Sequence, residues 1–234
     1  MLPREMLPPG AINEGEPVTP RPSATVLVVR GRDPWELLLM QRPGGADFAP
    51  GAYVFPGGTV HADDMGWGDE IRMAAVREVF EEVGILFARR GNRFAREPDC
   101  DRVRSIVEGG KSFGEALREL RLEPALDRLV LLARWVTPAQ LRRRYDARFF
   151  LAQLPPGQPV VPQDGEVADV IWTAPSTALA NPALTLVYAT RAVLESVAGD
   201  EDAAKLFSRT RQLKDVPIVE PRMVQTESGW EIER

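Results

Sequence analysis

Three glutamates in the first half of the chain, Glu78, Glu81 and Glu82, have a spacing that could bind a metal ion. Residues three and four positions apart share one face of a helix, so a helix here would bring the three carboxylates together, opposite an apolar stripe. Carboxylates held this close repel one another unless a cation lies between them. Oxygen-rich sites of this kind suit Mg²⁺ or Mn²⁺, which in turn hold phosphate oxygens.

The neighbouring residues favour a ligand site over a solvated acidic helix face, which is the ordinary interpretation of a glutamate pair. Arg77 lies one helical turn before Glu81, where it could orient that side chain. Gly57 and Gly58 precede the helix, and glycine lets a backbone approach a ligand or turn a carbonyl toward a metal. Gly84 is expected to end the helix in the left-handed conformation.

The stretch 55–86 resembles the Nudix box, which reads Gly, five residues, Glu, seven residues, then Arg-Glu-U-x-Glu-Glu-x-Gly-U with U aliphatic. Every fixed position of the second half is matched, from Arg77 to Ile85. The first half is longer, because Gly58 and Arg77 are 19 positions apart where the box has 14. Counted back from Arg77, Asp69 stands where the box has its first Glu. The five extra residues predict a longer loop before the helix.

The resemblance implies hydrolysis of a nucleoside diphosphate derivative at its diphosphate bond. Glu78, Glu81 and Glu82, with the backbone carbonyl of Gly57, would hold one to three divalent cations that clamp the diphosphate and activate a water. Glu78 and Glu82 would thereby be catalytic. Arg77 would hold the carboxylates in place by salt bridging.

Several residues outside the box are candidates for the same site. Glu166 is predicted to bind metal or act as the base, and its alternative is a solvated loop residue. Arg142, Arg143 and Arg144 could meet substrate phosphates, since arginine binds phosphate bidentately, and their alternative is a solvated basic turn. Arg42, which closes a predicted strand, is a similar candidate.

The resemblance extends over about residues 22–185 to the peroxisomal-type coenzyme A diphosphatases and their bacterial relatives. It is carried by LLLMQR at 37–42, PGAYVFPGG at 50–58, WVTP at 135–138 and YDARFF at 145–150. Coenzyme A or acyl-coenzyme A is therefore the expected substrate. An ADP-ribose or NADH pyrophosphatase and a non-catalytic nucleotide-sensing regulator are the alternatives.

The composition narrows the partners and the chemistry. A net charge of −5 and a pI near 5.2 argue against a nucleic-acid-binding surface, so a small-molecule nucleotide is the expected partner. The single cysteine, Cys100, fits a reducing cytoplasm. The single histidine, His61, is expected on the surface. No membrane association, signal peptide or peroxisomal signal is expected, so the predicted location is cytoplasmic, and a homodimer is compatible with the family.

The predicted fold class is α/β, a Nudix α/β/α sandwich with a mixed sheet, a helical insertion at about 89–123 and extra C-terminal helices. Residues 1–21 are expected to form a disordered proline-rich arm, 22–213 the Nudix domain and 214–234 a tail strapped over the surface. The expected strands are 23–29, 35–41, 52–55, 84–88, 127–136, 147–154 and 167–172. The expected helices are 69–83, 101–107, 113–122, 176–181, 184–198 and 200–213.

Overall fold

The computed structural model describes residues 10–46, 48–226 and 229–233. The main strands are β1 (Arg21–Gly31), β2 (Trp35–Gln41), β3 (Tyr53–Val54), β4 (Gly57–Thr59), β8 (Val130–Val136), β9 (Tyr145–Gln153), β10 (Asp169–Thr173) and β11 (Ile218–Val219). The helices are α1 (Glu70–Val83), α2 (Glu97–Glu108), α3 (Phe113–Glu119), α4 (Pro175–Ala180), α5 (Tyr188–Val197) and α6 (Ala203–Arg211). None of the described helices is long and apolar enough to cross a membrane.

One mixed sheet forms the centre of the molecule, in the order β10-β2-β1-β9-β8-β11. β1 and β9 run parallel over nine paired positions, from Arg21 opposite Tyr145 to Val29 opposite Gln153. The pairs β1–β2, β2–β10 and β8–β9 are antiparallel, and the short strands β3 and β4 pair with β2 and β1. A sheet with both pairing types that is buried on both faces needs helices on each side.

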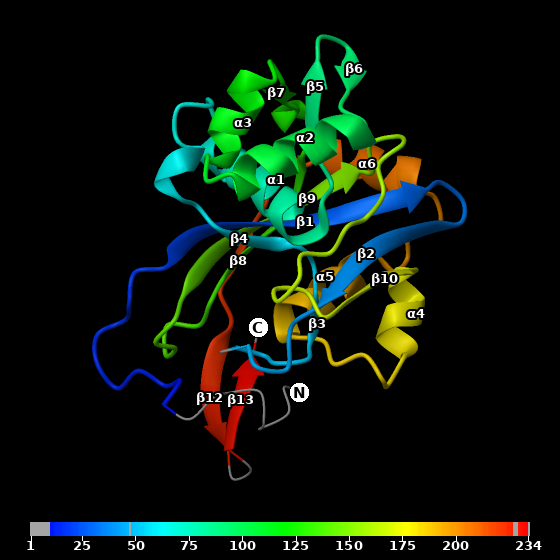
Figure 1. Ribbon diagram of the computed structural model, residues 1–234. Helices are drawn as coiled ribbons and strands as arrows, with labels where there is room; N and C mark the ends of the chain where they lie inside the picture. The colour runs from blue at the N-terminus through cyan, green and yellow to red at the C-terminus, as the bar shows by residue number, and fades with distance from the viewer. Residues whose placement is uncertain (1–9, 47, 227–228, 234) are drawn as a thin grey trace.

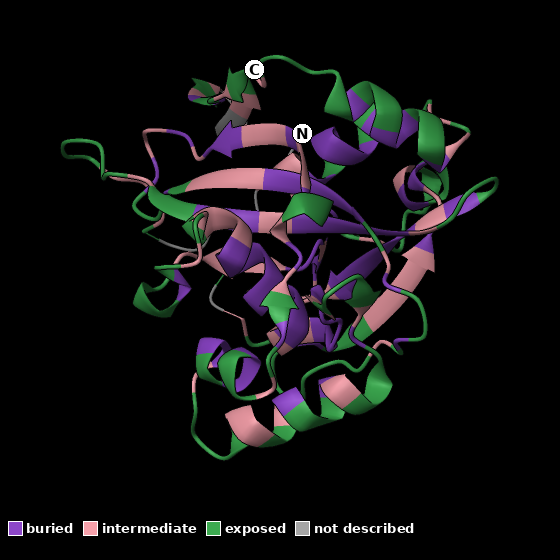
Figure 2. Ribbon diagram, turned by 90° about the horizontal axis from the view of Figure 1, so that it is seen from above, coloured by how far each residue is buried: buried purple, intermediate pink, exposed green. Residues whose placement is uncertain are grey.

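The two faces of β1 lead into two separate cores. Val26 and Val28 point to the side that α1 covers, whereas Leu27 and Val29 point to the side of α5 and α6. Figure 1 shows α1, α2 and α3 on one side of the sheet and α4 and α5 on the other. Buried residues follow the strands and the helix faces turned toward them (Figure 2). The predicted mixed sheet between helical layers is therefore confirmed.

The insertion is more than the two predicted helices. The strands β5 (Ala88–Arg90), β6 (Arg93–Phe94) and β7 (Glu123–Pro124) form a small sheet of their own around α2 and α3. The insertion packs on α1 through Phe113, whose ring lies 5.4 Å from that of Phe80. The lengthened loop before α1 also meets it, because the Arg118 guanidinium lies 4.6 Å from the ring of Trp67. The extra loop residues are thus anchored on the insertion.

The structure corrects some predicted elements. The strand expected at 84–88 starts only at Ala88, and Ile85, Leu86 and Phe87 are instead fully buried in the core. The tail expected to be a plain strap forms β11, which pairs with β8, and a hairpin of β12 (Arg222–Thr226) and β13 (Gly229–Glu233). Of these tail pairings, β11–β8 is non-local and β12–β13 is a local hairpin.

The N-terminal arm is described only in part, because residues 1–9 of the predicted disordered arm lie outside the described residues. The arm is hydrogen-bonded to the β8–β9 connection at Ala11 and Asn13, where the Asn13 N–H donates to the carbonyl of Gln140 at 2.7 Å.

Candidate metal centre

Local signals at both ends define α1, the helix that carries the glutamates. The Asp69 carboxylate accepts a hydrogen bond from the Arg72 N–H at 2.9 Å and caps the first turn. Gly84, with φ of 72°, ends the helix, and its N–H donates to the carbonyl of Phe80. The predicted helix boundaries are thus met, with Asp69 as the cap and not as part of the polar site.

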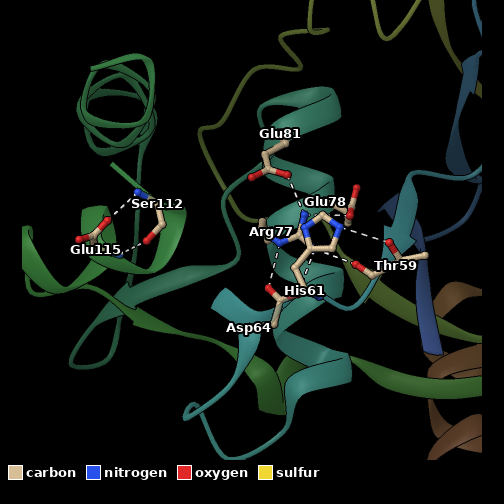
Figure 3. Close-up of polar contacts among 8 residues, drawn as sticks. All are labelled: Thr59, His61, Asp64, Arg77, Glu78, Glu81, Ser112 and Glu115. Carbon is tan, nitrogen blue, oxygen red and sulfur yellow. Dashed lines mark hydrogen bonds and ion pairs between the residues drawn. The ribbon is translucent and has the colours of Figure 1, made fainter. Parts of the chain in front are cut away.

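Arg77 lies at the centre of the polar face of α1 and is only 5% exposed. Its guanidinium donates to both oxygens of Asp64 at 2.9 and 3.0 Å. It also donates to Glu78 and Glu81, each at 2.8 Å. A fifth hydrogen bond, to the carbonyl of Thr59, ties the helix to β4 (Figure 3). The arginine therefore fixes the two glutamates in place.

The outer edge of β4 faces this polar side of α1. β4 pairs with β1 in an antiparallel ladder, in which hydrogen-bonded and non-hydrogen-bonded residue pairs alternate. The hydrogen bonds from the Val26 N–H to Pro56 and from the Val60 N–H to Pro22 show which pairs are hydrogen-bonded. In that alternation the N–H and carbonyl of Gly57 point away from β1. The Gly57 N–H donates to Oε2 of Glu82 at 2.8 Å. The Gly57 carbonyl points from the same edge, and its role as a metal ligand stays a prediction.

The glycine pair is required by close contacts. A Cβ on Gly57 would lie 2.2 Å from the carbonyl oxygen of Ala24, on the neighbouring strand. A Cβ on Gly58 would lie 2.4 Å from the carboxylate of Glu78. Absence of both side chains lets β4 join the sheet and lets Glu78 reach the strand.

All three glutamates bind protons more readily than in water. Burial and repulsion by Glu78 raise the pKa of Glu82 well above its usual value, although the Gly57 N–H opposes the shift. Burial likewise raises the pKa of Glu78 and of Glu81, although Arg77 opposes both shifts. The site therefore holds more negative charge than its protein surroundings stabilise, which favours a bound cation.

No three His, Cys, Asp or Glu side chains in the described residues lie close enough to form a metal site as they stand. Arg77 lies between Glu78 and Glu81, and Glu82 is turned to the Gly57 N–H. The donor set nevertheless fits Mg²⁺ or Mn²⁺, because it consists of oxygens whose charges repel one another. Glu78, Glu81 and Glu82 are the residues that would hold the ion.

Two predicted residues outside the box lie near the glutamates. The charge of Glu166 adds to the rise in pKa of both Glu81 and Glu82. The charge of Arg42 lowers the pKa of Glu82, and its Nε donates to the carbonyl of Phe48 at 2.9 Å. His61 is exposed, with Nε2 3.2 Å from Oγ1 of Thr59. The chain thus gathers residues from β2, β4, α1 and the loop before β10.

The arginine cluster before β9 is positioned differently. Arg144 is 8% exposed and donates to the carbonyls of Thr137 and Val18 and to the carboxylate of Glu220. Its prediction as a phosphate-binding residue does not fit this geometry, because its donors are directed at the N-terminal arm and the tail. Arg142 donates to the carbonyl of Ile12 at 3.0 Å. Phosphate binding by Arg142 and Arg143 stays a prediction.

Asp64 is the residue that the sequence analysis missed. It is fully buried and accepts two of the five hydrogen bonds that Arg77 donates, so it occupies the place that the register had given to Asp69. The box could have located it, since Asp64 follows Gly58 by the six positions that separate Gly from Glu in the pattern. The five extra residues therefore lie after this carboxylate, not before it.

Asp64→Ala is expected to lower the free energy of unfolding by about 3 kcal/mol, because it leaves Arg77 buried without its bidentate partner. Asp69→Ala is the matched control and should cost about 1 kcal/mol, the usual value of a helix cap. Urea denaturation of both variants measures the difference. Equal losses would show that Asp64 is not the structural partner of Arg77.

Comparison with known proteins agrees with this fold. The family model described as the NUDT19 Nudix domain matches residues 68–184, half of the chain. A Nudix hydrolase structure from Alicyclobacillus acidocaldarius superposes with a TM-score of 0.71 at 27% identity, covering 82% of this chain and 96% of that one. The architecture is thus that of the Nudix proteins. The chain belongs to the NUDT19 Nudix domain family.

Curated relatives cover similar parts of the chain. The Caenorhabditis elegans protein whose name contains nudix hydrolase 7 is 30% identical over 154 residues, which are 65% of this chain and 51% of that protein. The acyl-coenzyme A diphosphatase NUDT19 of Homo sapiens is 28% identical over 207 residues, 62% of this chain and 54% of that protein. This chain therefore spans about half the length of these relatives.

Proposed function

We propose that this chain is a metal-dependent hydrolase that cleaves the diphosphate bond of a nucleoside diphosphate derivative. The observation that carries the proposal is the polar face of α1, where Arg77 holds Glu78 and Glu81 and the Gly57 N–H holds Glu82. Family membership supports the same reaction class.

Charge determines the role of each residue in the proposed reaction. A phosphoanhydride resists attack because its oxygens are negative, so catalysis consists mainly of charge neutralisation and positioning. Mg²⁺ or Mn²⁺, when bound, supplies that neutralisation and lowers the pKa of an attacking water. Glu78, Glu81 and Glu82 would hold the ion, with the Gly57 carbonyl as a further oxygen donor.

Two residues at the margin of the glutamates complete the proposed site. Glu166 is the candidate for the base or for a further metal ligand, because its charge reaches Glu81 and Glu82. Arg42 is the candidate for a substrate phosphate, because its charge reaches the same centre from the end of β2. Arg77 acts through the carboxylates and is a positioning residue.

The proposed substrate is coenzyme A or acyl-coenzyme A. Support comes from the NUDT19 family model and from relatives in Homo sapiens and Gallus gallus that are named acyl-coenzyme A diphosphatases. Cleavage of coenzyme A by water at the diphosphate would release 3′,5′-ADP and phosphopantetheine.

A substrate screen with purified protein and Mg²⁺ or Mn²⁺, read by mass spectrometry, tests this proposal. We expect 3′,5′-ADP from coenzyme A and its acyl derivatives, and no product in the presence of EDTA. AMP from ADP-ribose or NADH instead would keep the chemistry and overturn the substrate. Nucleotide binding without any product would contradict the hydrolase and favour a sensor.

A further inference from the structure

The segment between β9 and β10 lies along the carboxyl end of α1 and carries Glu166. The Val161 N–H donates to the carbonyl of Val83, and the Gln163 N–H donates to the carbonyl of Glu82, both at 2.9 Å. These carbonyls belong to the last turn of the helix, where no partner within the helix exists. The segment therefore caps the helix at the residues next to the metal centre.

Glu166 lies three residues after Gln163, the last residue of the segment that contacts the helix. The Glu166 N–H donates to the carbonyl of Gln163 at 3.3 Å. Two residues later, the Ala168 N–H donates to the carbonyl of Gln41 and ties the chain to β2. The Glu166 side chain is exposed, so packing does not hold it. The backbone of this segment, and not side-chain packing, therefore determines where Glu166 stands relative to α1.

Gln158 anchors the other end of the segment inside the protein. It is 7% exposed, and its amide oxygen accepts a hydrogen bond from the Leu86 N–H at 2.7 Å. Its amide nitrogen donates to the carbonyls of Leu86 and Ala95 at 3.0 and 2.8 Å. The Gln158 side chain thus links three parts of the molecule: Leu86, just after α1, Ala95 in the insertion, and the segment that carries Glu166 (residues 158–166).

We propose that Gln158 is a positioning residue that sets Glu166 against the metal centre. The physical reason is that a buried amide with all three contacts satisfied is costly to displace, so it fixes the backbone at 158 as the helix contacts fix it at 161 and 163. The inference rests on the proposed function in one respect, namely that Glu166 acts in the metal site.

The test is Gln158→Met, which keeps the approximate shape and removes the three hydrogen bonds. Affinity for Mn²⁺, followed by electron paramagnetic resonance, is expected to fall about 10- to 100-fold, the usual effect of residues that orient metal ligands. Hydrogen exchange at Val161 and Gln163 is expected to accelerate. Gln140→Met is the matched control, because the Gln140 amide also bridges a backbone, that of Met223, at 3.4 Å. It should leave Mn²⁺ affinity unchanged.

A double-mutant cycle with Glu166→Gln shows whether Gln158 acts through Glu166. In the Glu166→Gln background, Gln158→Met should weaken Mn²⁺ binding by less than twofold. Three results would overturn the proposal. They are additive losses of Mn²⁺ affinity in the double mutant, wild-type Mn²⁺ affinity in Gln158→Met, and wild-type Mn²⁺ affinity in Glu166→Gln. Gln158→Asn replaces the Met variant if that one does not fold. Because these readouts are binding and exchange, they are independent of the substrate screen that tests the hydrolase.

Discussion

Glu82→Gln is expected to reduce hydrolase turnover by about 100-fold or more, because it removes a negative charge that the metal requires and keeps the size of the side chain. The amide oxygen of the new residue can still accept the hydrogen bond from the Gly57 N–H, so the fold should persist. Steady-state kinetics at saturating metal and circular dichroism measure the two effects.

The stability of the same variant gives an independent check. Burial and Glu78 raise the pKa of Glu82, so the folded state disfavours the charged form of this carboxylate. A neutral side chain removes that penalty, and the melting temperature should stay equal or rise. Glu70→Gln, on the exposed first turn of the same helix, is the control and should keep full activity. Wild-type turnover in Glu82→Gln would show that the proposed metal site is wrong.

Arg77→Met is expected to lower the free energy of unfolding by about 3–5 kcal/mol. Asp64 is fully buried and would lose its ion pair, and Glu78 and Glu81 would lose the charge between them. Turnover should fall too, because the glutamates would no longer be fixed. Urea denaturation at neutral pH gives the stability, and the substrate screen gives the activity.

Two further variants isolate the cause. Arg77→Met combined with Asp64→Asn removes both buried charges and should recover part of the lost stability. Arg134→Met removes an arginine whose partner, Asp146, lies at a partly exposed position, and should cost about 1 kcal/mol or less. A loss no larger in Arg77→Met than in Arg134→Met would contradict the structural role assigned to Arg77.

Local sequence signals predicted the helix that carries the glutamates. The spacing of Glu78, Glu81 and Glu82, the expected start of the helix near 69 and the stop at Gly84 all act within one helix, so periodicity and end signals were sufficient. The strand Trp35–Gln41 was predicted with its observed ends for the same reason, because a turn precedes it and apolar residues fill it.

The errors arose where contacts are non-local. The residue that matches the first Glu of the box depends on where the extra loop residues lie. Counting back from the helix selected Asp69, whereas counting forward from Gly58 selects Asp64, which is the partner of Arg77. In the sequence, Arg144 is one of three arginines in a basic turn. Its guanidinium N–H groups are occupied by Val18 of the N-terminal arm and Glu220 of the tail, which only the folded structure brings to it. The three hydrogen bonds of Gln158 likewise have no signature in the sequence around it.

The parallel pairing of β1 with β9 has a consequence for how the chain folds. Its nine paired positions join residues 21–29 to residues 145–153, so the middle of the sheet closes a loop of more than one hundred residues. Closing so long a loop costs chain entropy before the contacts that reward it can form, and such topologies fold slowly. During synthesis, β1, α1 and the insertion must all emerge before β9 can join the sheet, which leaves the apolar strand β1 without its principal partner until then.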